Sequence, residues 1–323
     1  MPCCRHGRTE VGVLQVLHAQ GGASFPHRLR RGWSSKGGVS KQRQVINEIS
    51  MSDDVHEAML AAGWSDGLPI VPPTVERVEI MLRGTSRDPA EVVGDVPPMY
   101  SPATIGNIAA NAVLAGCSPE HLRLVIAGVE AMLLDEFNLH GVHATTMGAT
   151  PCLIVSGSAR KECGLNTSHG ALGSGSRANA CIGRALKLVL QNVGGAKLGG
   201  TESTTLGTPC KFTLCVAEAE EALLAGWRPY HAESRGFNLG DSAVTVISCT
   251  SGPMQLVDFA TRDVVPLLRS LGSHLGVCYA AHMYMACAES NTARSPSQTR
   301  SMLPQARVSS ACGFFVCVAA SGH

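Results

Sequence analysis

Apolar and polar residues along the centre of the chain follow two periods, one typical of helices and one typical of strands. The helical spacing predicts helices over residues 54–62, 74–82, 103–114, 120–134, 177–191 and 258–270. Short apolar runs predict strands over 152–156, 211–217 and 243–249, and an extended segment over 68–71. Because strands alternate with helices, we expect an α/β fold with a layered mixed sheet and flanking helices.

Hydroxyl side chains mark where several of these helices begin. Thr74, Ser101 and Ser118 each precede an apolar periodic stretch, and a proline follows both serines. Such residues cap helix N-termini, and proline is favoured in the first helical position. These signals indicate a single main domain over residues 51–288.

The two ends of the chain differ from this domain in composition. Residues 1–50 are rich in arginine and poor in acidic residues, which is typical of a mitochondrial or plastid transit peptide. Alternatively, Met51 is the true start and the protein is cytoplasmic. Residues 289–323 show neither steady periodicity nor capping, and indicate a linker that is cut short or translation past a true exon end.

Composition and charge narrow the class of protein. Apolar residues make up 45% of the 323 residues and charged residues 16%, which favours a folded chain over a disordered one. No run of about 18 apolar residues occurs, so we expect no membrane span. Between positions 51 and 289 the chain holds 15 basic and 23 acidic residues, a net charge of −8. This acidic body argues against nucleic-acid binding.

The chain has 13 cysteines, but no Cys-x-x-Cys spacing occurs. Zinc-ribbon and thioredoxin-like sites are therefore not predicted, and we interpret most of the cysteines as small buried residues in a reducing compartment. The spacing of Cys210 and Cys215 places them on opposite faces of a strand, so no disulfide is expected between them. Cys117 directly precedes a predicted helix, whose dipole would favour its thiolate.

A loop rich in glycine and hydroxyl side chains, residues 164–176, leads into an amphipathic helix. Gly173 and Gly175 permit close approach of a ligand to the backbone, and the helix dipole favours an anion. Arg177 and Arg184 lie seven positions apart, two turns on one face, and would clamp a carboxylate or phosphate. The alternatives are a plain connection and two solvated arginines. The spacing matches no nucleotide-binding fingerprint, so the sequence indicates no specific nucleotide, and the cofactor is unknown.

Histidines offer general acid/base chemistry near neutral pH. His140 and His143 lie three apart, but Gly141 and the β-branched neighbours argue against a helix, and on a strand the imidazoles would face opposite ways. No third ligand with zinc spacing follows, so no metal site is predicted. His169, inside the glycine-rich loop, is best placed to meet an anion, and non-catalytic histidines are the alternative.

Asparagines stand on two predicted helices that are otherwise largely apolar. Asn107 and Asn111 share one helix face, and Asn179 and Asn192 lie on a later helix. Because buried amides need hydrogen-bond partners, these side chains either bond the helices to each other or line a polar pocket. Asp66 stands in an Asp-Gly turn, as a turn former or as a catalytic aspartate.

Five segments combine into a distinctive pattern. They are Gly-Trp-Ser-Asp-Gly-Leu-Pro-Ile-Val-Pro-Pro-Thr at 63–74, Asn-Ala-Val-Leu-Ala-Gly-Cys at 111–117, Ala-Thr-Thr at 144–146, Arg-Ala-Asn-Ala-Cys-Ile-Gly-Arg at 177–184 and Asn-Val-Gly-Gly at 192–195. The combination resembles a mostly bacterial, poorly characterised family associated with neighbouring or fused small proteins that carry a (seleno)cysteine-Gly-Ser-Cys motif, called UGSC. Thr145, Thr146 and the segment 177–184 match best.

The resemblance implies redox or thiol-dependent chemistry on a small molecule, with this domain binding the substrate. The chain has no Cys-Gly-Ser-Cys in its tail. The implied (seleno)thiol partner is therefore a separate protein.

These observations favour a soluble small-molecule enzyme, or enzyme subunit, that binds an anionic or thiol-bearing substrate in the glycine-rich loop. The residues expected to carry it are His169 and Cys117 for acid/base or nucleophilic chemistry and, for binding, Gly173, Gly175, Arg177, Asn179, Arg184, Thr145 and Thr146. One alternative is a non-catalytic substrate-binding or scaffold subunit of a (seleno)thiol redox partner. A nucleotide-binding regulator is a third class, against which the loop spacing argues.

Overall fold

The computed structural model describes residues 54–249 continuously, together with short segments at 11–15, 45–49, 254–256, 265–266, 268–270, 272–273, 307–308 and 316–318. The described helices are α1 (Val55–Ala61), α2 (Val75–Leu82), α3 (Ile105–Ala115), α4 (Leu122–Met132), α5 (Leu139–His143), α6 (Ala159–Glu162), α7 (Arg177–Asn192) and α8 (Tyr230–Arg235). Most of the two end segments predicted at 1–50 and 289–323, and most of the helix predicted over 258–270, lie outside the described residues.

The described strands form one mixed sheet and three strand pairs. They are β1 (Val11–Gln15), β2 (Val45–Ile49), β3 (Val92–Val96), β4 (Ser101–Thr104), β5 (Thr150–Ser156), β6 (Cys215–Ala217), β7 (Ala243–Cys249), β8 (Met254–Leu256), β9 (Arg307–Val308) and β10 (Val316–Val318). The sheet has the order β6-β5-β7-β9, in which β5 is parallel to β6 and antiparallel to β7. β1 pairs with β2, β3 with β4 and β8 with β10. The expectation of an α/β fold with a mixed sheet is confirmed.

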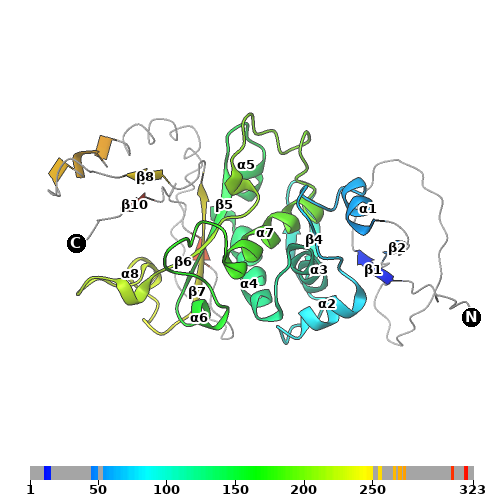
Figure 1. Ribbon diagram of the computed structural model, residues 1–323, viewed down its shortest axis with the longest axis horizontal. Helices are drawn as coiled ribbons and strands as arrows, with labels where there is room; N and C mark the ends of the chain where they lie inside the picture. Colours follow the sequence, from blue (N-terminus) through cyan, green and yellow to red (C-terminus); the bar gives the residue numbers. More distant parts are fainter. Residues whose placement is uncertain are drawn as a thin grey trace, which may run out of the picture.

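Helices α2, α3, α4 and α7 lie in layers over one face of this sheet (Figure 1). Leu153 and Val155 of β5 point into the main core, whereas Cys152 and Ile154 point to a smaller apolar cluster on the other face, as expected of successive strand residues. Helices α4 and α7 pack on the first face, α3 packs on both of them, and α2 packs on α3 (Figure 1). The central helices therefore separate the sheet from the N-terminal part of the domain.

Close approach of these layers depends on glycine at two helix positions. A Cβ on Gly183 of α7 would lie 2.7 Å from the backbone nitrogen of Leu214, next to β6. A Cβ on Gly128 of α4 would lie 2.9 Å from a methyl carbon of Leu186 on α7. Both distances are shorter than van der Waals contact. At Gly183 the contact is with backbone, so α7 packs on the chain next to β6 at a spacing that a side chain would prevent, whereas at Gly128 it is with the end of a leucine side chain, which can shift.

Two of the three predicted N-terminal signals are confirmed, and one is wrong. Thr74 caps α2, with its hydroxyl accepting from Arg77 N at 3.4 Å, and Ser118 precedes a 3-10 turn that leads into α4. Ser101 instead begins β4, which pairs with β3, and Thr104 caps α3. The local sequence pattern does not show the pairing of β4 with β3. Because of this pairing, α3 starts later than predicted, at Ile105.

The segment around the two neighbouring histidines is helical, contrary to expectation. Asn138 begins α5 with a positive φ of 50°, and its side chain accepts from Gly141 N at 3.3 Å. This cap compensates for the poor helix propensity of the segment. His143 is consequently buried, whereas His140 is exposed and its Nδ1 lies 3.3 Å from the Tyr100 hydroxyl. The strand predicted over 211–217 also shortens, to Cys215–Ala217.

Asparagine side chains connect α3 to α7, which confirms helix-to-helix hydrogen bonding. Asn192 Nδ2 donates to Asn111 Oδ1 at 2.8 Å and to the Trp64 carbonyl at 3.0 Å. Asn111 Nδ2 in turn donates to the carbonyl of Asn107 at 2.9 Å. Among the described helices, none is long and apolar enough to cross a membrane.

Candidate functional site

The glycine-rich loop, residues 164–176, is exposed over most of its length, and one side chain attaches its first part to α7. Asn179 of α7 accepts from Asn166 N at 2.9 Å and donates to the Asn166 carbonyl at 3.2 Å. Gly173 and Gly175 are exposed, and a Cβ on Gly175 would meet no atom within 4 Å. The Asn179 amide is therefore occupied by the loop itself and is buried, rather than presented to a ligand.

The two arginines that were expected to clamp an anion contact other parts of the chain. Arg177 donates through Nε to the Gly116 carbonyl at 2.9 Å and through NH2 to the Cys117 carbonyl at 3.3 Å, at the C-terminus of α3. Arg184 makes a bidentate ion pair with Asp66. Both guanidinium groups thus donate to acceptors that are remote in the sequence, two backbone carbonyls for Arg177 and a carboxylate for Arg184. The predicted clamp over the glycine-rich loop is not formed.

The two residues expected to supply chemistry lie in opposite environments. His169 is exposed, and its Nδ1 lies 3.2 Å from the Ser168 hydroxyl. Cys117 is buried, and this burial raises the pKa of its thiol well above the usual value, with Cys181 adding to the effect and Arg177 opposing it. The expectation of a favoured thiolate is therefore wrong, because the cost of desolvation exceeds the attraction of the nearby cation.

Thr145 and Thr146 lie beside a different group of polar residues. Thr146 accepts through its carbonyl from Thr205 N at 3.0 Å, and the Thr204 hydroxyl donates to the carbonyl of Met147 at 2.9 Å. These contacts join the segment before β5 to residues 202–205. Within the described part of the chain, neither threonine contacts the glycine-rich loop.

We call His143, Lys187, Glu202 and Lys211 the lysine cluster. Glu202 belongs to the segment 202–205. Lys211 Nζ lies 2.8 Å from Glu202 Oε1 and donates to the Thr204 hydroxyl at 2.7 Å and to the Ala149 carbonyl at 3.0 Å. Burial alone would raise the pKa of Glu202, but hydrogen bonds from Lys211 and Thr204 outweigh it and lower that pKa. Glu202 and Lys211 are therefore a paired, charged couple.

The other two members of the cluster have no such partners. His143 is buried, and its Nε2 has no hydrogen-bond partner within the described ranges. Burial lowers the pKa of His143 to about 3, and the charge of Lys187 contributes. Burial likewise lowers the pKa of Lys187 to about 8, with Lys211 adding to the effect and Glu202 opposing it. His143 is therefore a neutral imidazole. Lys187, whose charge acts on His143, loses its proton near pH 8.

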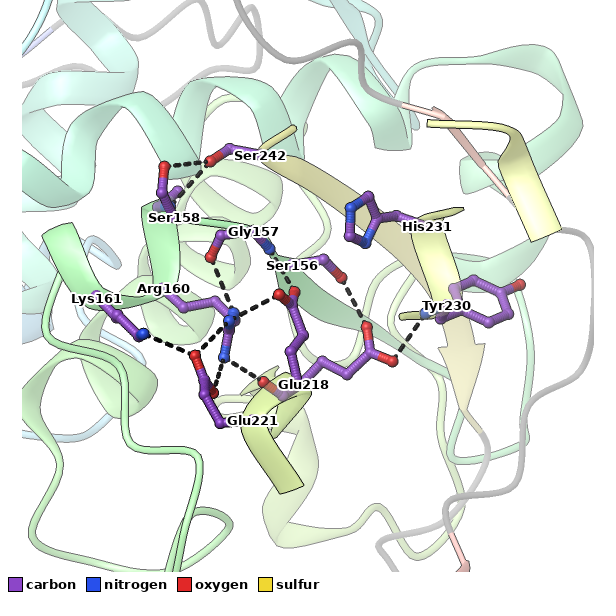
Figure 2. A network of polar contacts seen from close by, with 12 residues as sticks. Ser156, Gly157, Ser158, Arg160, Lys161, Glu218, Glu221, Tyr230, His231 and Ser242 are labelled. Carbon is purple, nitrogen blue, oxygen red and sulfur yellow. Dashed lines mark hydrogen bonds and ion pairs between the residues drawn. The ribbon is translucent and has the colours of Figure 1, made fainter. Parts of the chain in front are cut away.

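A second polar group, the edge network, lies where β5 and β6 end and β7 begins (Figure 2). Arg160, just after β5, is its centre and is buried. Its guanidinium contacts Glu220 at 2.8 Å and Glu221 at 3.1 Å, and donates to the Glu218 carbonyl at 2.6 Å. Because β5 and β6 are parallel, their carboxyl ends share one edge of the sheet, which is the usual place for sites in α/β proteins.

The edge network also contains the described residues best arranged to hold a metal ion. One ligand atom from each of Glu218, Glu220 and His231 lies within 4.8 Å of the others. His231 belongs to α8 and is fully buried. The sequence pattern predicts no metal site, because these three residues do not follow any zinc-ligand spacing.

Sequence reasoning missed both groups, although each leaves a signal. Lys187 interrupts the run Ala-Leu-Lys-Leu-Val-Leu on the helix after the glycine-rich loop. Glu218, Glu220 and Glu221 directly follow a strand. A charge inside an apolar helix and a run of carboxylates at a strand end are both places to look for chemistry.

No family model matches the chain, and no match is found among curated proteins or solved structures. What the lysine cluster and the edge network do has to be inferred from their own contacts and charges.

Proposed function

We propose that the protein is a small-molecule enzyme that binds an anionic substrate at the lysine cluster, where Lys187 acts as the proton acceptor. The observation that carries this proposal is the contrast between the two lysines. Lys211 is fully engaged by Glu202, Thr204 and Ala149. Lys187, by comparison, has no hydrogen-bond or ion-pair partner among the described residues.

The charge of the cluster favours an anion. Glu202 neutralises one lysine, and His143 is neutral at physiological pH because of its lowered pKa. While Lys187 is protonated, its charge is therefore not balanced within the cluster, and a carboxylate or phosphate would balance it. The unpartnered Nε2 of His143 offers a further hydrogen-bonding atom to the same ligand.

The lowered pKa of Lys187, about 8, makes part of its population an uncharged amine at neutral pH. A general base works best when its pKa lies near the working pH. In this role the amine takes a proton from a C–H or O–H bond of the substrate and becomes an ammonium, which the substrate's negative charge then stabilises. The sequence hypothesis placed the anion in the glycine-rich loop. The present proposal places it at the lysine cluster, beside Thr145 and Thr146.

The thiol-dependent alternative, in which the chain presents substrate to a separate (seleno)thiol protein, stays a prediction. Burial raises the pKa of the Cys117 thiol, so this chain's own thiol gives the alternative no support. The test that separates the two is activity of the purified protein without a partner.

The experiment measures proton exchange, which can be followed across many compounds at once. A panel of small carboxylates and phosphate esters is incubated with the protein in D2O, and deuterium incorporation is followed by NMR. We expect exchange at one carbon of at least one compound, with a rate that rises with pH to a plateau above about pH 8. Lys187→Met, which keeps the length of the side chain, should abolish it.

Lys197→Met is the matched control, because Lys197 is exposed. Trace acylation followed by mass spectrometry supplies a second readout that needs no substrate. Lys187 should react with a midpoint near pH 8, well below the ordinary lysine value of about 10.4, and small carboxylates should protect it. A midpoint at the ordinary value, or exchange that survives Lys187→Met, would refute the proposal.

A further inference from the structure

The edge network contains three potential metal ligands from two segments that meet at the carboxyl ends of β5 and β6. Glu218 and Glu220 follow β6, and His231 lies in α8. We propose that these three residues bind one divalent metal ion of the zinc class, with one imidazole nitrogen and two carboxylate oxygens as protein ligands. Their ligand atoms already lie within 4.8 Å of one another. This site is distinct from the lysine cluster and does not depend on it.

The imidazole of His231 has its free nitrogen in the form that a metal requires. Its Nε2 lies 3.3 Å from the carbonyl oxygen of Asn238. A carbonyl only accepts hydrogen bonds, so Nε2 carries the proton and Nδ1 of the neutral ring carries a lone pair. That Nδ1 is buried and has no hydrogen-bond partner in the part of the chain that the structure describes, and the side chain is fully buried.

This arrangement is the one by which proteins orient metal-binding histidines. The ring nitrogen that does not bind the metal typically donates to a backbone carbonyl or a carboxylate, which fixes the tautomer and the ring plane. A buried nitrogen that nothing satisfies destabilises the folded chain. A metal ion at this place would satisfy Nδ1 and remove that destabilisation.

The contacts of the Glu218 carboxylate also favour a bound cation. Its carboxylate accepts from the Ser156 hydroxyl at 3.0 Å and from Tyr230 N at 2.8 Å, both of which are neutral donors (Figure 2). Arg160 reaches Glu218 through the backbone carbonyl and places its charge on Glu220 and Glu221. Among the described residues, the Glu218 carboxylate therefore has no cationic partner, and each of its oxygens retains a lone pair for one.

The remaining carboxylate is held in position by the rest of the network. Glu220 accepts from Gly157 N and from Arg160 NH2, so one oxygen faces the end of β5 and the other the guanidinium. One nitrogen and two oxygen ligands, with no thiolate, suit zinc, cobalt or manganese. Three protein ligands also leave coordination positions for water or a substrate, as in catalytic zinc sites.

The experiment is a titration of the metal-free full-length chain with Zn²⁺, followed by isothermal calorimetry, and with Co²⁺, followed by visible absorption. We expect one ion per chain and a cobalt spectrum without a sulfur-to-metal charge-transfer band. Glu218→Gln and His231→Gln should weaken binding by at least about tenfold. Circular dichroism of the metal-free variants separates loss of ligands from loss of folding.

Glu221→Gln is the matched control, because Glu221 contacts Arg160 but is not one of the three ligands. It should bind the ion as the unaltered chain does. The proposal is overturned if no stoichiometric ion binds, or if folded Glu218→Gln binds as tightly as Glu221→Gln. A sulfur-to-cobalt charge-transfer band would also overturn it, since the cysteines would then hold the ion.

Discussion

Arg184 binds Asp66 through two parallel contacts, Nε to Oδ2 at 2.8 Å and NH2 to Oδ1 at 2.7 Å. The same guanidinium donates to the Leu68 carbonyl at 3.2 Å. Asp66 also accepts from Leu68 N at 3.1 Å, which confirms its role as a turn former. One ion pair thus shapes the Asp-Gly turn and fixes it to α7.

Removing the charge of Asp66 should destabilise the fold. The two side chains are only 13% and 10% exposed, so Asp66→Asn would leave a poorly solvated guanidinium without its counter-charge. We expect a loss of about 2–4 kcal/mol in the free energy of unfolding, measured by urea denaturation. Glu162→Gln breaks the more exposed pair with Arg123 and should cost about 0.5 kcal/mol. Equal losses in the two variants would show that the Asp66 pair contributes nothing special.

The amide contact between α3 and α7 should appear as coupling between two mutations. Asn192→Ala leaves Asn111 Oδ1 and the Trp64 carbonyl without this donor. We expect each single alanine variant, at 111 or 192, to cost about 1–3 kcal/mol. The double variant should cost about 1 kcal/mol less than their sum, in thermal or urea unfolding. Strict additivity would contradict the contact.

Mild acid should destabilise the protein through His143. Its pKa in the folded chain is about 3 because of burial, against about 6.5 in an unfolded chain. Between these values the unfolded chain takes up a proton that the folded chain does not, so stability falls as the pH falls. From pH 6.5 to pH 5 the loss should be about 2 kcal/mol. His143→Gln should remove this part of the pH dependence of the free energy of unfolding. If that free energy falls equally with pH in both proteins, His143 is not the cause.

Packing of α7 on β6 should fail when Gly183 gains a side chain. The added Cβ would lie 2.7 Å from Leu214 N, so Gly183→Ala has to displace the helix from the strand. We expect a cost of about 1–3 kcal/mol, visible as a lower melting temperature. Gly173→Ala is the control, since its Cβ would meet nothing nearer than 3.4 Å. A melting temperature unchanged by Gly183→Ala would mean that the space between α7 and β6 accommodates a methyl group.

Local pattern predicts most of the helices but not where the chain switches between element types. The helix expected over 177–191 is present as α7, and the strand over 243–249 as β7, because apolar periodicity and caps are local. The start of α3 and the helical state of α5 were missed. The first depends on pairing with β3, and the second on a single asparagine cap.

The candidate site was harder to predict, because its contacts join residues that are distant in sequence. Arg177 and Arg184 bind partners 61 and 118 positions away, so their spacing on one helix face says nothing about where the guanidinium groups go. The ion pair of Arg160 with Glu220 spans 60 positions. A glycine-rich loop, in contrast, is visible in the sequence whether or not it binds a ligand.

The attachment of that loop by Asn179 has a practical consequence. The Asn179 amide accepts from Asn166 N and donates to the Asn166 carbonyl, so the start of the loop stays attached to α7 whatever lies between Asn166 and the helix. The intervening residues 168–170 and 172–175 are exposed, and lengthening a closed surface loop costs little entropy. The span is therefore a natural insertion point, where an affinity tag or a fluorescent label can be placed while the fold stays intact.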